Sequence, residues 1–174
     1  MWRSRVAIRF CPVAKAKPIP DLSADDSYAE AATKIVSVRA GELTENAPGV
    51  LDTGDIERVH DMRVATRRLR AALEIFEPCF PDKPYSQALA EVKRLADALG
   101  ERRDRDVAIA ALHAFIDQMP APDRRGVASL IERLRTEQDD ANRDLAPLVD
   151  GPNLAELRAS LDELVAVARS EVAA

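Results

Sequence analysis

The sequence of 174 residues contains few of the residues that build β-sheets and tight turns. It has four Phe, two Tyr and one Trp, and only six Gly. Aromatic side chains favour strands, whereas the Ala, Leu, Arg and Glu that dominate this chain favour helices. Apolar residues make up 47% of the chain and charged residues 32%, which is typical of a globular domain with a hydrophobic core. The composition therefore predicts an all-α fold.

Other absences restrict the location and the function. Only Cys11 and Cys79 are present, on unlike segments, so we expect no disulfide framework and a cytoplasmic location. No apolar run approaches the ~20 residues of a membrane span. The net charge of −5 argues against indiscriminate binding to nucleic acid or to an anionic membrane, which usually requires a basic domain. Any binding of anions must therefore depend on a local cluster of positive charge.

Capping residues and helix breakers predict an antiparallel bundle of about five helices. We expect residues 1–22 to form a flexible N-terminal arm and residues 23–174 to form the bundle. The predicted helices cover residues 24–46, 56–77, 85–118, 123–149 and 153–174. Their loops are short, which implies that consecutive helices are antiparallel neighbours. A segment with three prolines, residues 78–84, should form a rigid connector.

Three predicted helices have capping residues at their starts. Ser23 with Asp26 resembles a capping box for the first helix, and Asp55 can cap the second. Asn153 with Glu156 forms a similar capping pair for the last helix.

The stretch VHDMRVATRRLR, residues 59–70, concentrates cations on the second helix. At ~100° per residue, one narrow sector of this helix holds His60, Arg63, Arg67 and Arg70, which we call the arginine row. The row lies beside a predicted core face made of Val59, Met62, Ala65, Leu69, Ala72, Leu73 and Phe76. A second apolar strip, Val64, Ala71 and Ile75, flanks its other side. Glu74 can neutralise Arg70 by an i, i+4 contact, but the rest of the row has no local partner.

Two interpretations of the arginine row remain open. Acidic residues of other helices can pair with it, which would make the row structural. Alternatively, guanidinium groups one helical turn apart, ~5.4 Å, can meet successive phosphates of an extended polyanion. Such contacts are charge-assisted and often bidentate, hence stronger than neutral hydrogen bonds. His60 can donate to the same anion when it is suitably oriented or protonated.

A second motif, LGERRDRDV at residues 99–107, lies on the third predicted helix. Its predicted core stripe comprises Leu89, Val92, Ala96, Leu99, Val107 and Ala110. Arg103 and Asp106 project from the same face, and a buried charge is expensive unless it is paired. We therefore expect Asp104 and Asp106 to hold Arg103, which can still present one edge to an anion. Four further cations are predicted to form a solvated rim: Lys93, Arg94, Arg102 and Arg105.

Together the two motifs resemble those of the CHAD family, histidine-containing all-helical domains often found with CYTH triphosphatase domains. The first family signature is matched by His60, Arg63, Val64, Arg67, Arg68, Leu69 and Arg70. The second is matched by Leu99, Gly100, Arg103, Asp104, Asp106 and Val107. The resemblance extends from about Ser23 to Val149.

Family members bind inorganic polyphosphate through a basic central surface, so the resemblance implies that polyphosphate is the ligand here. The arginine row and Arg103 would form the binding site. The usual family domain has two similar helical halves, each with a basic helix, and this chain resembles only the first. Either its groove has one wall, or a second copy completes the groove as a homodimer.

Catalysis finds little support in the sequence. The chain has two histidines, no Cys/His cluster with metal spacing and no P-loop. We therefore expect a non-enzymatic module without metal or cofactor, which recognises neither a nucleic-acid sequence nor a membrane. Histidine phosphotransfer is an alternative, since His60 lies on a helix. Arg63 and Val64 occupy the places where phosphotransfer domains have Lys and Gly. A purely structural helical scaffold is the other alternative.

Overall fold

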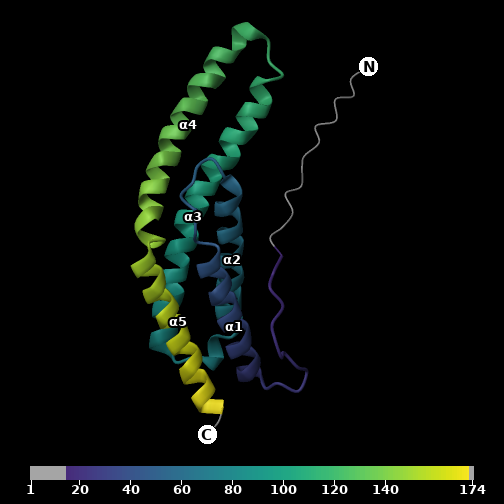
Figure 1. Ribbon diagram of the computed structural model, residues 1–174, viewed down its shortest axis with the longest axis vertical. Coiled ribbons are helices and arrows are strands. Elements are labelled where there is room, and N and C mark those ends of the chain that lie inside the picture. Colours follow the sequence, from purple (N-terminus) through teal and green to yellow (C-terminus); the bar gives the residue numbers. More distant parts are fainter. Residues whose placement is uncertain (1–14, 173–174) are drawn as a thin grey trace.

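The computed structural model describes residues 15–172, which form five α-helices and three short 3₁₀-helices and contain no strand. The α-helices are α1 (Tyr28–Glu45), α2 (Ile56–Ile75), α3 (Asp82–Ile116), α4 (Arg124–Leu145) and α5 (Gly151–Val172). The 3₁₀-helices are η1 (Glu77–Cys79), η2 (Ala121–Asp123) and η3 (Ala146–Leu148). Consecutive α-helices run in opposite directions from α1 to α4, but α5 continues in the same direction as α4 (Figure 1), so the expectation that all consecutive helices are antiparallel neighbours is wrong for this last pair. The predicted all-α bundle is thus confirmed.

The starts of α1 and α2 are fixed by capping side chains. Ser27 caps α1, because its hydroxyl accepts from the Glu30 N–H at 3.2 Å and the Glu30 carboxylate accepts from the Ser27 N–H at 2.8 Å. The predicted box of Ser23 and Asp26 is therefore wrong. These two residues form a turn before the helix, in which the Ser23 N–H donates to Asp26 at 3.0 Å. Asp55 caps α2, as predicted, by accepting from the Glu57 N–H.

Two other helices begin before their predicted starts. Helix α3 starts at Asp82 and includes Pro84 in its first turn, where the missing proline N–H costs no helical hydrogen bond. The rigid connector is therefore shorter than residues 78–84. Helix α5 starts at Gly151, and the carboxylate of Asp150 accepts from the Asn153 N–H at 2.8 Å. Asp150, and not Asn153, thus performs the capping role.

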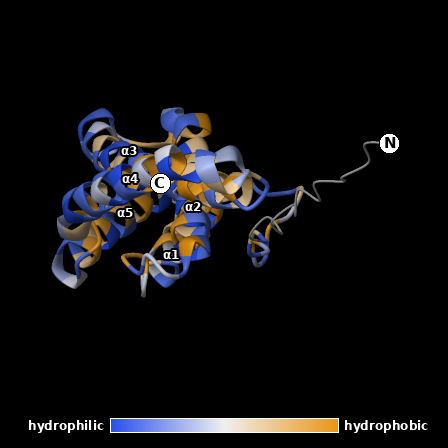
Figure 2. Ribbon diagram, turned by 90° about the horizontal axis from the view of Figure 1, so that it is seen from above, coloured by the Kyte–Doolittle hydropathy of each residue, from blue (hydrophilic) through white to orange (hydrophobic). Residues whose placement is uncertain are grey.

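The hydrophobic core lies between α1, α2, α5 and the first part of α3. All seven residues of the predicted core face of α2 are buried, from Val59 to Phe76. All of them except Ala65 pack in one cluster with residues such as Leu43 of α1, Leu95 of α3 and Leu161 of α5. Seen along the bundle, the apolar sides of the helices turn towards one another (Figure 2).

The second half of α3 differs from its predicted packing. Val92 and Leu99 are fully buried as predicted, but Val107 is 50% exposed and Ala110 is exposed. The reason is that α3 and α4 form a long hairpin that extends past α1, α2 and α5 (Figure 1). Within residues 15–172, α4 is the one helix that packs against this outer part of α3, which we call the hairpin tip, residues 107–116.

Residues 15–27 precede α1 and contact it at several points. The Lys17 N–H donates to Glu42 at 2.5 Å, and Arg39 donates to the Lys17 carbonyl at 3.0 Å. Lys34 donates to the carbonyl of Asp21 at 2.6 Å. The rest of the predicted arm, residues 1–14, lies outside the described part of the chain. Among residues 15–172, no helix combines the length and the apolar character needed to span a bilayer.

Candidate functional site

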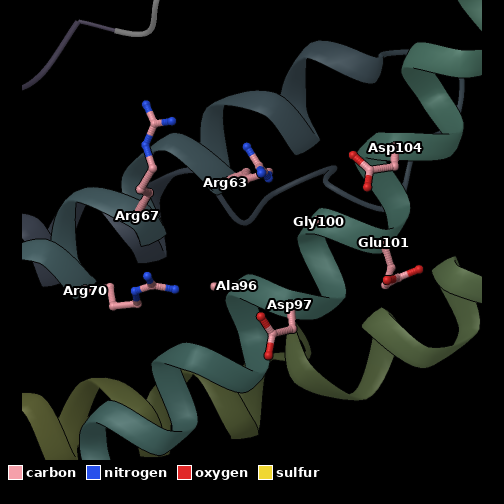
Figure 3. A pocket seen from close by; sticks show the side chains of 8 residues that line it. All are labelled: Arg63, Arg67, Arg70, Ala96, Asp97, Gly100, Glu101 and Asp104. Atoms are coloured by element: carbon pink, nitrogen blue, oxygen red, sulfur yellow. The ribbon is translucent and has the colours of Figure 1, made fainter.

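The arginine row borders a groove of about 630 Å³ between α2 and α3. Helix α2 lines the groove with Arg63, Arg67 and Arg70 from successive turns; the Arg70 side chain points toward α3, whereas the Arg67 guanidinium turns away from α3 (Figure 3). Helix α3 forms the opposite wall with Ala96, Asp97, Gly100, Glu101 and Asp104. The groove thus joins the arginine row of the first motif to the start of the second motif.

The arginines of the groove differ in their partners. Arg70 contacts Glu74 at 3.3 Å, which confirms the predicted i, i+4 pair, and Lys93 approaches the same carboxylate at 3.7 Å. By contrast, no carboxylate of residues 15–172 lies within 4.0 Å of the guanidinium nitrogens of Arg63 or Arg67. Two adjacent members of the row therefore keep their charge uncompensated by a direct contact.

The opposite wall of the groove is acidic, a feature that was not predicted from the sequence. Asp97 and Asp104 lie on the side of α3 that faces the arginines (Figure 3), and neither has an ion-pair partner in the described part of the chain. Glu101 pairs instead with Arg105 on its own helix. The signal was present in the sequence, because residues 97, 101 and 104 have the three- and four-residue spacing of one helical side. These carboxylates lower the positive potential of the groove.

Gly100 forms part of the groove floor beneath Arg63. A Cβ atom added at Gly100 would lie 3.9 Å from Arg63 Nε, which is an ordinary van der Waals distance. The absence of a side chain thus leaves the space between Arg63 and the backbone of α3 open. A long side chain at this position would fill the groove.

His60 lies at the N-terminal end of the row but does not line the groove. Its Nε2 atom is buried and has no hydrogen-bond partner among the described residues. On the other flank of the row, Val64 is buried, whereas Ala71 and Ile75 are exposed. The predicted second apolar strip is therefore present only at Val64.

A family model named CHAD domain matches residues 34–174, which is most of the chain. The chain belongs to the CHAD family. The match includes both motifs and continues through α5 to the C-terminus, beyond the resemblance seen in the sequence. No curated protein matches the chain significantly.

The second motif of this CHAD domain joins α3 to α2 through Arg103 and to α4 through Asp106. Arg103, whose side chain is 14% exposed, donates to the Ile56 carbonyl at 2.8 Å and lies 3.7 Å from the Glu57 carboxylate. It therefore fastens the start of α2 to α3. In the described chain, Arg103 forms neither an ion pair nor a hydrogen bond with Asp104 or Asp106. The expectation that these two carboxylates hold Arg103 is therefore wrong.

The partner of Asp106 is Arg102, which was predicted to lie on a solvated rim. Both side chains are fully buried, and Arg102 Nη1 donates to Asp106 at 2.5 Å. Gln138 of α4 donates to the other carboxylate oxygen at 2.5 Å. Burial raises the pKa of Asp106 above its usual value, although the hydrogen bond from Gln138 and the charge of Arg102 oppose this rise. Two further nitrogens of Arg102 are buried without a partner in the described region.

The charged groups of this CHAD domain thus divide into two sets. Arg102, Arg103 and Asp106 make direct contacts that dock helices, whereas Arg63 and Arg67 face open space. Within residues 15–172, no group of three His, Cys, Asp or Glu side chains is arranged to hold a metal ion. The groove can accept an anion on its α2 side, and hydrogen-bond donors or cations on its α3 side.

Proposed function

We propose that this CHAD domain binds inorganic polyphosphate in the groove between α2 and α3 and catalyses no reaction. The observation that carries the proposal is that Arg63 and Arg67 line the groove without a carboxylate partner in the described chain. Like charges four residues apart on a helix repel each other, so an incoming anion relieves this repulsion. Phosphate oxygens also accept charge-assisted hydrogen bonds from guanidinium groups, often two at a time.

The arginine row would align an extended ligand along the groove. Arg63 and Arg67 would make the strongest contacts, because neither guanidinium has to leave another partner. Arg70 would bind more weakly, since it shares its charge with Glu74. His60 and Arg103 lie towards the start of α2 and would contact a chain that extends beyond the groove. Burial of His60 Nε2 gives no support to phosphoryl transfer at that atom.

An unbranched polyanion suits this geometry better than a single phosphate. Successive turns of α2 repeat every ~5.4 Å, so one phosphate cannot bridge the whole row. Asp97 and Asp104 on the opposite wall repel any anion, and several simultaneous contacts are needed to offset this repulsion. The salt dependence of binding should therefore be steep, because a polyanion releases counterions when cationic side chains replace them.

Calorimetric titration with long-chain polyphosphate tests the proposal on Arg63→Ala and Arg67→Ala variants. Loss of a hydrogen bond to a charged group costs ~1.5–3 kcal/mol, so each substitution should weaken binding by about tenfold or more. Each should also reduce the slope of log K against log salt concentration by about one.

Arg169→Ala is the matched control, because it removes the same charge from an exposed position on α5. It should leave the affinity nearly unchanged. If Arg63→Ala and Arg67→Ala bind polyphosphate as tightly as the parent, the site is wrong. If all three substitutions weaken binding equally, the ligand senses overall charge and not the groove.

A further inference from the structure

At the end of the groove beyond Arg70, one carboxylate connects the two helices that form the walls. Glu74 lies one turn past Arg70 on α2, and Lys93 lies one turn before Asp97 on α3. The Arg70 side chain points toward α3 (Figure 3). A single oxygen, Glu74 Oε1, lies 3.3 Å from Arg70 Nε and 3.7 Å from Lys93 Nζ. Two cations from facing helices thus share one carboxylate oxygen.

Both contacts of Glu74 are loose. Charge-assisted N–H···O bonds are normally ~2.7–2.9 Å long, so this oxygen approaches neither cation closely. The three side chains are between 42% and 47% exposed. Ion pairs with this much exposure contribute little, because water solvates both partners. Glu74 can therefore turn out to solvent at little cost, and another anion can take its place.

The charges at this end of the groove are not balanced. In the described part of the chain, no carboxylate other than Glu74 lies within 4.0 Å of the charged nitrogens of Arg70 or Lys93. Two cations with one carboxylate leave one positive charge over. Lys93 also continues the wall of α3 that carries Asp97 and Asp104, so this wall changes from negative to positive at Lys93. Both helices therefore offer a cation to an anion that reaches this point.

We propose that the polyphosphate site continues from Arg70 to Lys93, and that Glu74 occupies this extension as an internal anion until a phosphate displaces it. The inference rests on the proposed function and names which chains that site prefers. The Glu74 carboxylate marks the place of the phosphate, because it already lies between the two cations. A phosphate in the chain has separate non-bridging oxygens for Arg70 and Lys93, whereas Glu74 offers one oxygen to both. The phosphate can therefore approach each cation more closely.

The extension makes binding depend on the length of the polyphosphate. From Arg63 to Glu74 the axis of α2 advances by roughly 16 Å. A chain of three phosphates has only two P–O–P links and does not span this distance. When it binds at Arg63 and Arg67, it leaves the contacts of Glu74 in place. A long chain reaches Lys93 as well, so the site should prefer long chains, and Glu74 should weaken that preference.

Calorimetric titration of the full chain with long-chain polyphosphate and with tripolyphosphate tests the extension. Glu74→Gln removes the internal anion and should strengthen long-chain binding by up to about fivefold. It should also steepen the slope of log K against log salt concentration by about one, because one more positive charge is available. Lys93→Ala should weaken long-chain binding and reduce the slope by about one. The affinity for tripolyphosphate should respond much less to Lys93→Ala.

Glu91→Gln and Arg94→Ala are the matched controls, because they make the same charge changes close by on α3. Both side chains line a different cavity, between α3 and α5. They should change the long-chain affinity less than Glu74→Gln and Lys93→Ala do. If each control has the same effect as its counterpart, polyphosphate responds only to nearby charge, and the extension is wrong.

The double variant Glu74→Gln, Lys93→Ala tests the competition itself. In the parent, part of the contact with Lys93 is lost again because Glu74 has to be displaced. Lys93→Ala should therefore cost more long-chain affinity in the Glu74→Gln background than in the parent. Equal costs in the two backgrounds would show that Glu74 does not compete with phosphate for Lys93.

The same titrations separate this inference from the proposed function. A parent chain that does not bind polyphosphate, or that binds it without Arg63 and Arg67, contradicts the function and the extension with it. A parent that binds through Arg63 and Arg67, but treats Glu74→Gln and Lys93→Ala like their controls, contradicts the extension and leaves the function standing.

Discussion

At the scale of single residues, the second motif shows how neighbouring arginines acquire different roles. Adjacent positions on a helix differ by ~100°, so Arg102 and Arg103 point to different neighbours. Arg102 turns to the core and donates to Asp106, which also accepts from Gln138, whereas Arg103 reaches the start of α2. The sequence indicates that one arginine of this motif is paired in the interior. It does not indicate which, because the position of α4 decides that.

The buried pair should respond very differently to single and double substitution. Arg102→Met leaves Asp106 as an uncompensated buried charge and should lower the free energy of unfolding by ~3–5 kcal/mol. Asp106→Leu should have a similar effect, because it leaves Arg102 unpaired. The double variant should lose much less than the sum of the two, as buried ion pairs can often be replaced by apolar residues. Urea denaturation of the four chains measures this coupling.

Arg105→Met is the control for these variants, because Arg105 lies on the same helix and its ion-pair partners, Glu101 and Glu137, are exposed. Exposed ion pairs contribute ~0–1 kcal/mol, so this substitution should have a small effect. Additive losses in the double variant would show that Arg102 and Asp106 act independently.

At the scale of helices, the sequence predicts packing faces better than helix ends. The core face of α2 is correct at all seven positions, because its apolar spacing follows the helical period without interruption. The start of α1 is wrong because the stretch SADDSYAE offers two overlapping capping patterns. Glu and Gln are the usual partners in a capping box, which favours Ser27 with Glu30 over Ser23 with Asp26. Side-chain length therefore distinguishes the two patterns.

The two serines provide a matched test of the helix start. Ser27→Ala removes the cap of α1 and should lower stability by ~1 kcal/mol. For a chain of this size, the melting temperature should fall by ~2–4 °C. Ser23→Ala removes a hydroxyl from an exposed turn and should change stability by less than ~0.5 kcal/mol. Equal effects of the two substitutions in thermal denaturation would contradict the cap at Ser27.

At the scale of the whole molecule, the net charge of −5 does not describe the surface that a ligand meets. The sequence correctly separates Arg70, which pairs with Glu74, from Arg63 and Arg67, which have no local partner. The acidic wall could not be predicted from spacing along α3 alone, because the packing of α3 on α2 places Asp97 and Asp104 opposite these arginines. Local pairing follows from spacing along one helix, whereas the field in a groove depends on two helices.

The acidic wall makes a prediction that is opposite in sign to those for the arginines. Asp104→Asn removes a carboxylate that faces the groove and has no ion-pair partner in the described chain, so it should strengthen polyphosphate binding at little cost in stability. Exposed charge interactions contribute ~0.2–1 kcal/mol, which corresponds to an increase in affinity of up to about fivefold. Glu163→Gln changes the net charge equally at an exposed position on α5 and should have a smaller effect. Salt should reduce the difference between the two variants, since the screening length is ~10 Å at 0.1 M. The polyphosphate affinity of both variants is to be measured by titration at low and at high salt. If Asp104→Asn and Glu163→Gln increase the affinity equally, polyphosphate responds to the total charge of the molecule and not to the wall facing Arg63.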